Sequence, residues 1–341
     1  MKFKLSILTL ALLGFSAAAH AESKKLYIYT WDTYAAPALF KKFEAETGIE
    51  VITDIYSSND TLVAKLKAGG AYDIVTPTGN YVPLMIEEKL LQPLPEGLAA
   101  QGAAMDAAVR KPAYDAEYKY VLPLFYGSTA LAVNTKLTKE DVTSWQQFFT
   151  RPAGEGPSLG VLDDVGTVMD LASIAMGKDF CDASSETFKA MQKLLMEQKP
   201  FVKVYGATGY FERLAAGEVA IQMAWSGDIY KVRQQNPDIK YVYPQEGVEL
   251  WVDNLTIPAA AKNVEAAKLF IEFALKPENI AAWSESSGNV PSVAAAKALL
   301  PESLKTAPEF NIPAGVKTVL AVPCPVEVVK AYNQIWEKLL K

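Results

Sequence analysis

The alternation of predicted strands and helices over residues 24–92 constrains the fold of this chain more than any other feature. Three segments are rich in β-branched and aromatic residues, which is typical of strands, and two amphipathic segments that end at glycine separate them. Short strand–helix–strand units of this kind force a parallel sheet with right-handed crossovers. The sequence therefore predicts an α/β fold. The strands are expected at 26–30, 51–56 and 71–76, and the helices at 37–48 and 58–68.

An aromatic and acidic cluster, Trp31, Asp32 and Tyr34, lies where the first predicted strand ends. In an open α/β sheet, ligands bind outside the carboxyl ends of the strands, so this cluster is a candidate binding site. Thr78 and Asn80 follow the third predicted strand at the corresponding place. Turn formation explains Thr78, Asn80 and Asp32 as well as ligand contact does, because such residues favour turns.

Residues 1–21 have the three zones of a secretory signal peptide. Two lysines are followed by an apolar run and by small residues that end at Ala21. No later segment has the ~18 unbroken apolar residues that a membrane-spanning helix needs. We therefore expect cleavage after Ala21 and a mature protein in the periplasm.

The charge of the chain bears on the class of its partner. The formal net charge is −6, and the predicted signal peptide would remove two lysines and no acid. Nucleic acid and anionic lipid both need clustered positive charge, so neither is expected as a partner. Long-range attraction would mildly favour a cationic ligand, although acidity for solubility alone explains the charge equally well.

The absence of histidine from the mature chain argues against an enzyme. The one histidine, His20, would leave with the signal peptide. Its loss removes Ser–His and Cys–His nucleophile pairs and histidine metal sites. We expect no catalysis, no metal and no cofactor.

Cys181 and Cys324 are the two cysteines of the chain. Cysteines often pair in an oxidising compartment. Nothing in the sequence brings these two together, so a disulfide and two free thiols both remain open.

Further candidates lie in the second half of the chain. Trp225 and Trp251 fall at or beside strand termini, and both could instead be core aromatics. Asp253 lies on the predicted strand at 250–257, where a buried acid needs a partner, either a ligand or an internal salt bridge. Asp164 precedes a predicted helix and could be its N-cap or a ligand contact.

Four motifs follow one another in the order Trp-Asp-Thr-Tyr, Tyr-Asp-Ile-Val, Met-Ala-Trp-Ser-Gly and Trp-Val-Asp-Asn-Leu-Thr-Ile-Pro. With them the chain resembles the periplasmic spermidine/putrescine-binding proteins of ABC importers over nearly its whole mature length. The resemblance implies a two-lobed type II periplasmic binding protein, each lobe a mainly parallel sheet flanked by helices. It also implies a polyamine ligand and the membrane permease of an ABC importer as partners, and we expect a monomer.

The expected lobes are discontinuous in sequence. The N-terminal lobe should comprise 22–128 plus 254–290, and the C-terminal lobe 131–250 plus 293–341. Short structured crossings are expected between them.

The resemblance also assigns site residues. A pocket for polyamines needs carboxylates spaced to match the ammonium groups and aromatic faces that attract them and cover their methylenes. By the resemblance, the ligand-binding residues are Trp31, Tyr34, Thr78, Asp164, Trp225, Trp251 and Asp253. Asp32, Asn80 and Asn289 complete the expected ligand-binding set from their positions in the sequence.

The chain also departs from the family pattern. Thr167 stands where a glutamate is frequent, and Asn80 and Asn289 stand where tyrosines are expected. Residues 322–323 are apolar where polar side chains are expected. These changes favour putrescine slightly over spermidine. They leave open another amine or an amino acid as ligand, and a ligand-sensing role beside a membrane receptor.

Overall fold

The computed structural model describes residues 24–138, 141–150 and 158–341, so the predicted signal peptide at 1–21 lies outside the described residues. Within the described part, eleven strands form one mixed sheet in the order β2-β1-β3-β9-β4-β7-β5-β6, with β8 and β10 also paired to β4 and β11 to β9. The strands are β1 Lys24–Trp31, β2 Ile49–Tyr56, β3 Ile74–Val75, β4 Val121–Asn134, β5 Leu159–Val161, β6 Val202–Tyr205, β7 Ile221–Trp225, β8 Ile239–Val242, β9 Val248–Thr256, β10 Val290–Pro291 and β11 Thr318–Leu320.

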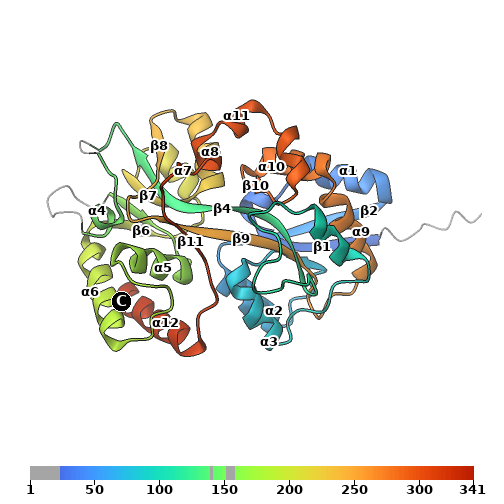
Figure 1. Ribbon diagram of the computed structural model, residues 1–341, viewed down its shortest axis with the longest axis horizontal. Coiled ribbons are helices and arrows are strands. Elements are labelled where there is room, and N and C mark those ends of the chain that lie inside the picture. Colours follow the sequence, from blue (N-terminus) through green and yellow to red (C-terminus); the bar gives the residue numbers. More distant parts are fainter. Residues whose placement is uncertain (1–23, 139–140, 151–157) are drawn as a thin grey trace, which may run out of the picture.

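Helices cover the sheet in both halves of the molecule (Figure 1). Short 3-10 turns complete several of the connections. The α-helices are α1 Pro37–Thr47, α2 Asn59–Lys67, α3 Val82–Glu87, α4 Trp145–Phe149, α5 Val165–Ala175, α6 Ser185–Gln198, α7 Tyr210–Ala215, α8 Ser226–Gln235, α9 Val264–Ala274, α10 Pro277–Ser287, α11 Glu302–Lys305 and α12 Val326–Leu340.

Two long antiparallel strands, β4 and β9, connect the halves, as Figure 1 shows. They pair from Val121 opposite Thr256 to Thr129 opposite Glu249. At one end of the sheet β1 pairs in parallel with β2 and β3, and at the other end β5 pairs in parallel with β6 and β7. The parallel strand–helix units expected from 24–92 are therefore present, although the third strand is reduced to β3.

The buried apolar side chains form two separate clusters, one in each half. The first surrounds β1, β3 and the helices α9 and α10, and the second surrounds β7 and the helices α5, α6 and α12. The apolar residues of α12 recur on one face of the helix, and that face packs in the second cluster. The aromatic ring of Trp225 packs against both clusters.

The lobe boundaries expected from sequence differ from the packing in one segment. Val293, Ala296, Leu300 and Leu304 lie in the first cluster, whereas the sequence placed 293–341 in the C-terminal lobe. Only the last part of that range, which includes α12, packs in the second cluster. The boundaries remain a prediction.

A disulfide joins Cys181, in the loop before α6, to Cys324, in the segment before α12. The bond closes a loop with a sequence separation of 143, and both cysteines pack against the second cluster. It ties the C-terminal segment to the half that α12 covers. Among the described helices, none has the length and apolar character needed to cross a membrane.

Candidate ligand-binding site

A cavity of about 460 Å³ lies where strands from both halves end. Trp31 ends β1, Tyr56 ends β2 and Trp225 ends β7, and all three line it. The place is the one expected for ligands in α/β sheets. Every residue of the predicted set lines this cavity, namely Trp31, Asp32, Tyr34, Thr78, Asn80, Asp164, Trp225, Trp251, Asp253 and Asn289. Their contact with a ligand stays a prediction.

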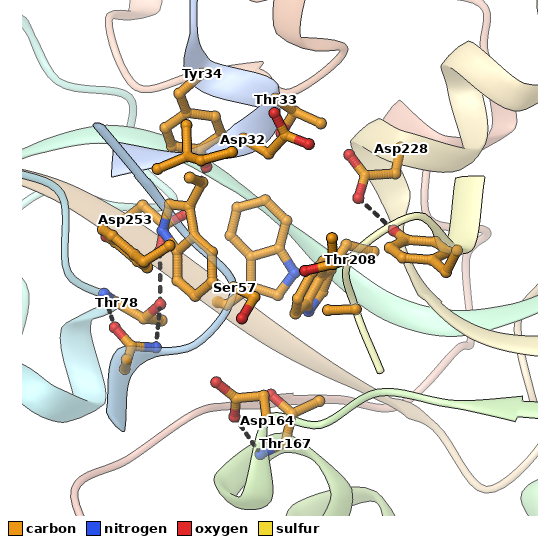
Figure 2. Close-up of a pocket in the computed structure, with 18 of the residues that line it drawn as sticks. Asp32, Thr33, Tyr34, Ser57, Thr78, Asp164, Thr167, Thr208, Asp228 and Asp253 are labelled. Atoms are coloured by element: carbon orange, nitrogen blue, oxygen red, sulfur yellow. Dashed lines mark hydrogen bonds between the residues drawn. The ribbon is translucent and has the colours of Figure 1, made fainter. Parts of the chain in front are cut away.

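Three carboxylates stand on different sides of the cavity. Figure 2 shows Asp253 on one side, Asp228 across from it, and Asp164 below them with Thr167. They come from β9, from the first turn of α8 and from the residue before α5. A ligand in the cavity would therefore face acids from several directions.

Asp253 is buried and accepts hydrogen bonds from the hydroxyls of Tyr34 and Thr78, the latter at 2.7 Å. Burial raises the pKa of this carboxyl to about 7, although the two hydroxyls oppose the rise. Among the described residues, no lysine or arginine forms an ion pair with it, so the internal salt bridge considered from sequence is not found there. Only hydroxyl groups compensate this acid, and a cation would stabilise its charged form.

Thr78 holds Asp253 in position. Its hydroxyl donates to Asp253 and accepts from the side-chain NH₂ of Asn59 at 3.0 Å. Its backbone N–H donates to the side-chain oxygen of Asn59, also at 3.0 Å. The side-chain oxygen of Asn80 is buried without a partner among the described residues. Asn289 is buried against Gly227, at the start of α8. A Cβ added to Gly227 would lie only 1.9 Å from the side-chain oxygen of Asn289.

Tryptophan rings supply the apolar walls. The rings of Trp31 and Trp225 meet edge to face with centroids 5.7 Å apart, and Trp31 also packs on Tyr56 at 4.6 Å. The indole N–H of Trp31 donates to the Thr76 carbonyl oxygen, which fixes that ring. Trp251 is 7% exposed, and its N–H has no partner in the described part of the chain. Aromatic faces of this kind attract ammonium groups and pack on methylenes.

Asp164 caps a helix and also lies in the cavity lining. Its carboxylate caps α5 by accepting from the Thr167 backbone N–H at 3.0 Å, and it also lines the cavity. Burial, and secondarily the charge of Asp60, raises the pKa of Asp164 to about 6. A carboxylate has room for further donors after one capping bond, so the cap does not exclude a ligand.

Asp228 and Lys231 line the cavity but were not predicted. Asp228 accepts a hydrogen bond from the Tyr210 hydroxyl, and burial raises its pKa to about 6. Burial lowers the pKa of the Lys231 ammonium, while Asp228 and Asp32 oppose that shift. The helical spacing of 228 and 231 places both on one side of α8, but only the cavity reveals which side.

Glu249 also lines the cavity and was not predicted. It is buried on β9, two residues before Trp251, and accepts from the Thr129 hydroxyl at 2.7 Å. Burial raises its pKa to about 8. In the part of the chain that the structure describes, no group of three or more His, Cys, Asp or Glu is arranged to hold a metal ion.

The arrangement defines a class of protein: a two-part α/β molecule with an acidic, aromatic cavity between its halves. The model of the bacterial extracellular solute-binding protein family matches residues 38–312, and this chain belongs to that family. The family is one of solute-binding proteins and not of enzymes. The predicted type II periplasmic binding-protein fold is confirmed.

Relatives of known name are solute-binding proteins as well. The spermidine/putrescine-binding periplasmic protein of Escherichia coli is 34% identical over 294 residues, covering 85% of this chain and 84% of its own. A putrescine-binding periplasmic protein of Pseudomonas aeruginosa is 27% identical and covers 99% of this chain and 98% of its own. A solved structure, a putative spermidine/putrescine ABC transporter protein from Listeria monocytogenes, has a TM-score of 0.85 at 29% identity, covering 93% of this chain and 99% of its own.

Proposed function

We propose that this protein captures a polyamine in the periplasm and delivers it to the permease of an ABC importer. The single observation that carries the proposal is Asp253, a buried carboxylate without a cationic partner among the described residues, in a cavity walled by tryptophans. The names of the relatives from Escherichia coli and Pseudomonas aeruginosa, a spermidine/putrescine-binding and a putrescine-binding periplasmic protein, support the same ligand class.

The chemistry of a polyamine matches the cavity. One ammonium group would donate to Asp253 in a charge-assisted hydrogen bond, which is stronger than a bond between neutral groups. The methylene chain would pack on the faces of Trp251 and Trp225, which also attract the ammonium charge. Removal of this apolar surface from water would add to the binding free energy.

A diamine fits better than a triamine in this proposal. Thr167 provides no charge beside Asp164, and Lys231 brings a cation of the protein to the Asp228 end of the cavity. A third ammonium group there would face a like charge. We therefore favour putrescine over spermidine.

Lys231 also motivates a second candidate ligand. An amino acid with a terminal amine could place its ammonium at Asp253 and its carboxylate at Lys231, since both residues line the cavity. The surrounding acids, Asp32, Asp164, Asp228 and Glu249, outnumber this one lysine and favour the diamine. A ligand-sensing role beside a membrane receptor would use the same cavity.

The cellular setting belongs to the same proposal. Residues 1–21 would be cleaved after Ala21, and the mature protein would act as a monomer without metal or cofactor. Mass spectrometry of the exported protein would test the cleavage site, and size-exclusion chromatography would test the monomer.

A thermal melt with a ligand panel tests the function. A ligand that binds only the folded state stabilises it by about 2.7 kcal/mol at a hundredfold excess over Kd. Putrescine should raise the melting temperature most, followed by spermidine, with neutral and acidic metabolites without effect. A panel in which amino acids shift the melt and polyamines do not would reject the polyamine.

A further inference from the structure

Strand β9 places three side chains of one face on the cavity. Side chains alternate across a strand, so Glu249, Trp251 and Asp253 point the same way, and all three line the cavity. At about 3.3 Å per residue, the Cα atoms of Glu249 and Asp253 lie about 13 Å apart with Trp251 midway. The strand thus carries an acid at each end of an aromatic side chain.

Glu249 lacks a cationic partner. It is 1% exposed and accepts a hydrogen bond from the Thr129 hydroxyl on β4. Among the described residues, no lysine or arginine forms an ion pair with it. A buried carboxylate without a counter-charge is costly, so this end of the cavity would gain from a cation.

The titratable groups around Glu249 do not supply a cation. Helix α5 brings Asp170, and the residue before α5 is Asp164, while β8 brings the phenol of Tyr241. Asp170 is 2% exposed, and one of its carboxylate oxygens has no partner among the described residues. Burial raises the pKa of Glu249 to about 8; the Thr129 hydroxyl opposes the rise and the charge of Asp164 adds to it.

Trp251 gives an independent indication of a ligand beside these acids. It is more than nine-tenths buried, lines the cavity, and leaves its indole N–H without a partner in the described chain. Only a group inside the cavity can contact this ring further. The indole N–H is a donor and cannot bind an ammonium group, so the part of Trp251 that serves a diamine is its ring face, which packs on methylenes.

We propose that Glu249 is the second ammonium-binding carboxylate of the cavity, so that a diamine lies along β9 over Trp251 with its ammonium groups at Asp253 and Glu249. This inference rests on the proposed function and adds a residue that sets the charge and length of the ligand. Glu249 is protonated in the empty cavity and ionises when the ammonium arrives. The carboxyl proton passes to solvent and the ammonium keeps its own, so binding releases protons.

A ligand pair separates the two ends of the site. Butylamine has the carbon chain of putrescine and one ammonium group, so it can occupy Asp253 without needing Glu249. Wild-type protein should bind putrescine far more tightly than butylamine. Equal affinity of the wild-type protein for the two ligands would overturn the proposal without any variant.

Variants sharpen the test. Glu249→Gln should weaken putrescine by about a hundredfold or more, as expected when one member of a buried pair is removed. The same variant should bind butylamine with a Kd within about twofold of the wild-type value, because distant groups act independently. Glu218→Gln, which removes the same charge from an exposed position, is the matched control and should change neither. Equal losses for both ligands, or no loss for either, would contradict the role of Glu249.

Glu249→Asp provides a length test if the amide variant folds poorly. It keeps the charge and shortens the side chain by one methylene, so the preferred diamine should lengthen from putrescine to cadaverine. Calorimetry in buffers of different ionisation enthalpy should show proton release in wild type and less in Glu249→Gln. An unchanged length preference in Glu249→Asp would count against the proposal, whereas a wild type that binds no polyamine would reject the proposed function itself.

Discussion

Asp253 lies buried with Tyr34 and Thr78 as hydrogen-bond donors and, in the described chain, without a lysine or arginine against it. The sequence predicted this acid because a carboxylate on a central strand needs a partner. Lys231 on α8 was not predicted as a cavity residue, because a charged residue on an amphipathic helix is usually solvated. Glu249 was missed as well, because it precedes the predicted strand at 250–257, whereas β9 begins at Val248.

Asp253→Asn should weaken putrescine binding strongly. The amide keeps the shape and removes the charge, which leaves the ammonium without a counter-ion at a cost of about 3–5 kcal/mol. That cost corresponds to a hundredfold or more in Kd. Trp251→Ala should weaken binding by less, through lost cation–π and methylene contacts.

Calorimetry and a thermal melt on the same Asp253→Asn protein separate two roles of this residue. A ligand contact predicts lost affinity with a folded protein. Normal affinity with a lowered melting temperature would make Asp253 a structural residue only.

The buried acids should also make the ligand-free protein less stable as pH rises. Burial raises the pKa of Asp164 to about 6, of Asp253 to about 7 and of Glu249 to about 8. Their ordinary values are lower, so the folded state binds more protons than the unfolded state between about pH 4 and 8. Stability is therefore largest at the acid end of this window and declines through the folded-state pKa values.

Melts between pH 5 and 8, with and without putrescine, measure this effect. The ligand should reduce the decline, because its ammonium groups stabilise the charged carboxylates. A ligand-free melting temperature that rises over this range would show that these acids are not held in their protonated forms.

At the scale of elements, the sequence predicted the bounds of helices and strands where the apolar pattern is strong. The sequence predicts helices at 264–274 and at about 326–340, and α9 and α12 have these bounds, since their apolar residues recur on one face. The sequence predicts two separate strands at 120–124 and 129–134, whereas the structure has the single strand β4, which stays paired with β9 from Phe125 to Thr129. The short strands β5, β6 and β8 were not predicted, because so few residues carry little pattern.

Gly127 shows how β4 shapes the cavity. A Cβ at this position would lie 2.4 Å from the ring of Trp251 and 2.5 Å from the Ser226 hydroxyl. Gly127→Ala should therefore displace the Trp251 ring, with an overpacking cost of about 1–3 kcal/mol.

Calorimetry on Gly127→Ala should show weaker putrescine binding than wild type. Gly206→Ala is the matched control, because its Cβ would meet its nearest neighbour, Val204, at 4.0 Å. Equal effects of the two substitutions would argue that Trp251 does not need its present position.

At the scale of the whole molecule, the α/β class was predictable because strand–helix order limits topology. The two-lobed design was implied by the resemblance to the polyamine-binding proteins. The packing of Val293, Ala296 and Leu300 in the first cluster was not predictable, since it depends on which half the chain meets after β10. The contact of Trp31 with Trp225 joins side chains that end strands of the two halves.

Such contacts suggest closure of the halves over the ligand, with β4 and β9 as the hinge segments. Small-angle scattering should show a smaller radius of gyration when putrescine is added at saturation. Dimensions that stay the same at saturation would contradict closure.

The central claim is that this cavity binds a polyamine, and calorimetric titration of putrescine into the wild-type protein tests it most directly. The protein should be purified under native conditions, with native mass spectrometry to identify any retained ligand and dialysis to remove it. We predict saturable binding of one putrescine per chain, tighter than that of butylamine or of any amino acid. Absence of heat and of saturation with both putrescine and spermidine, while an amino acid binds one to one, would contradict the account.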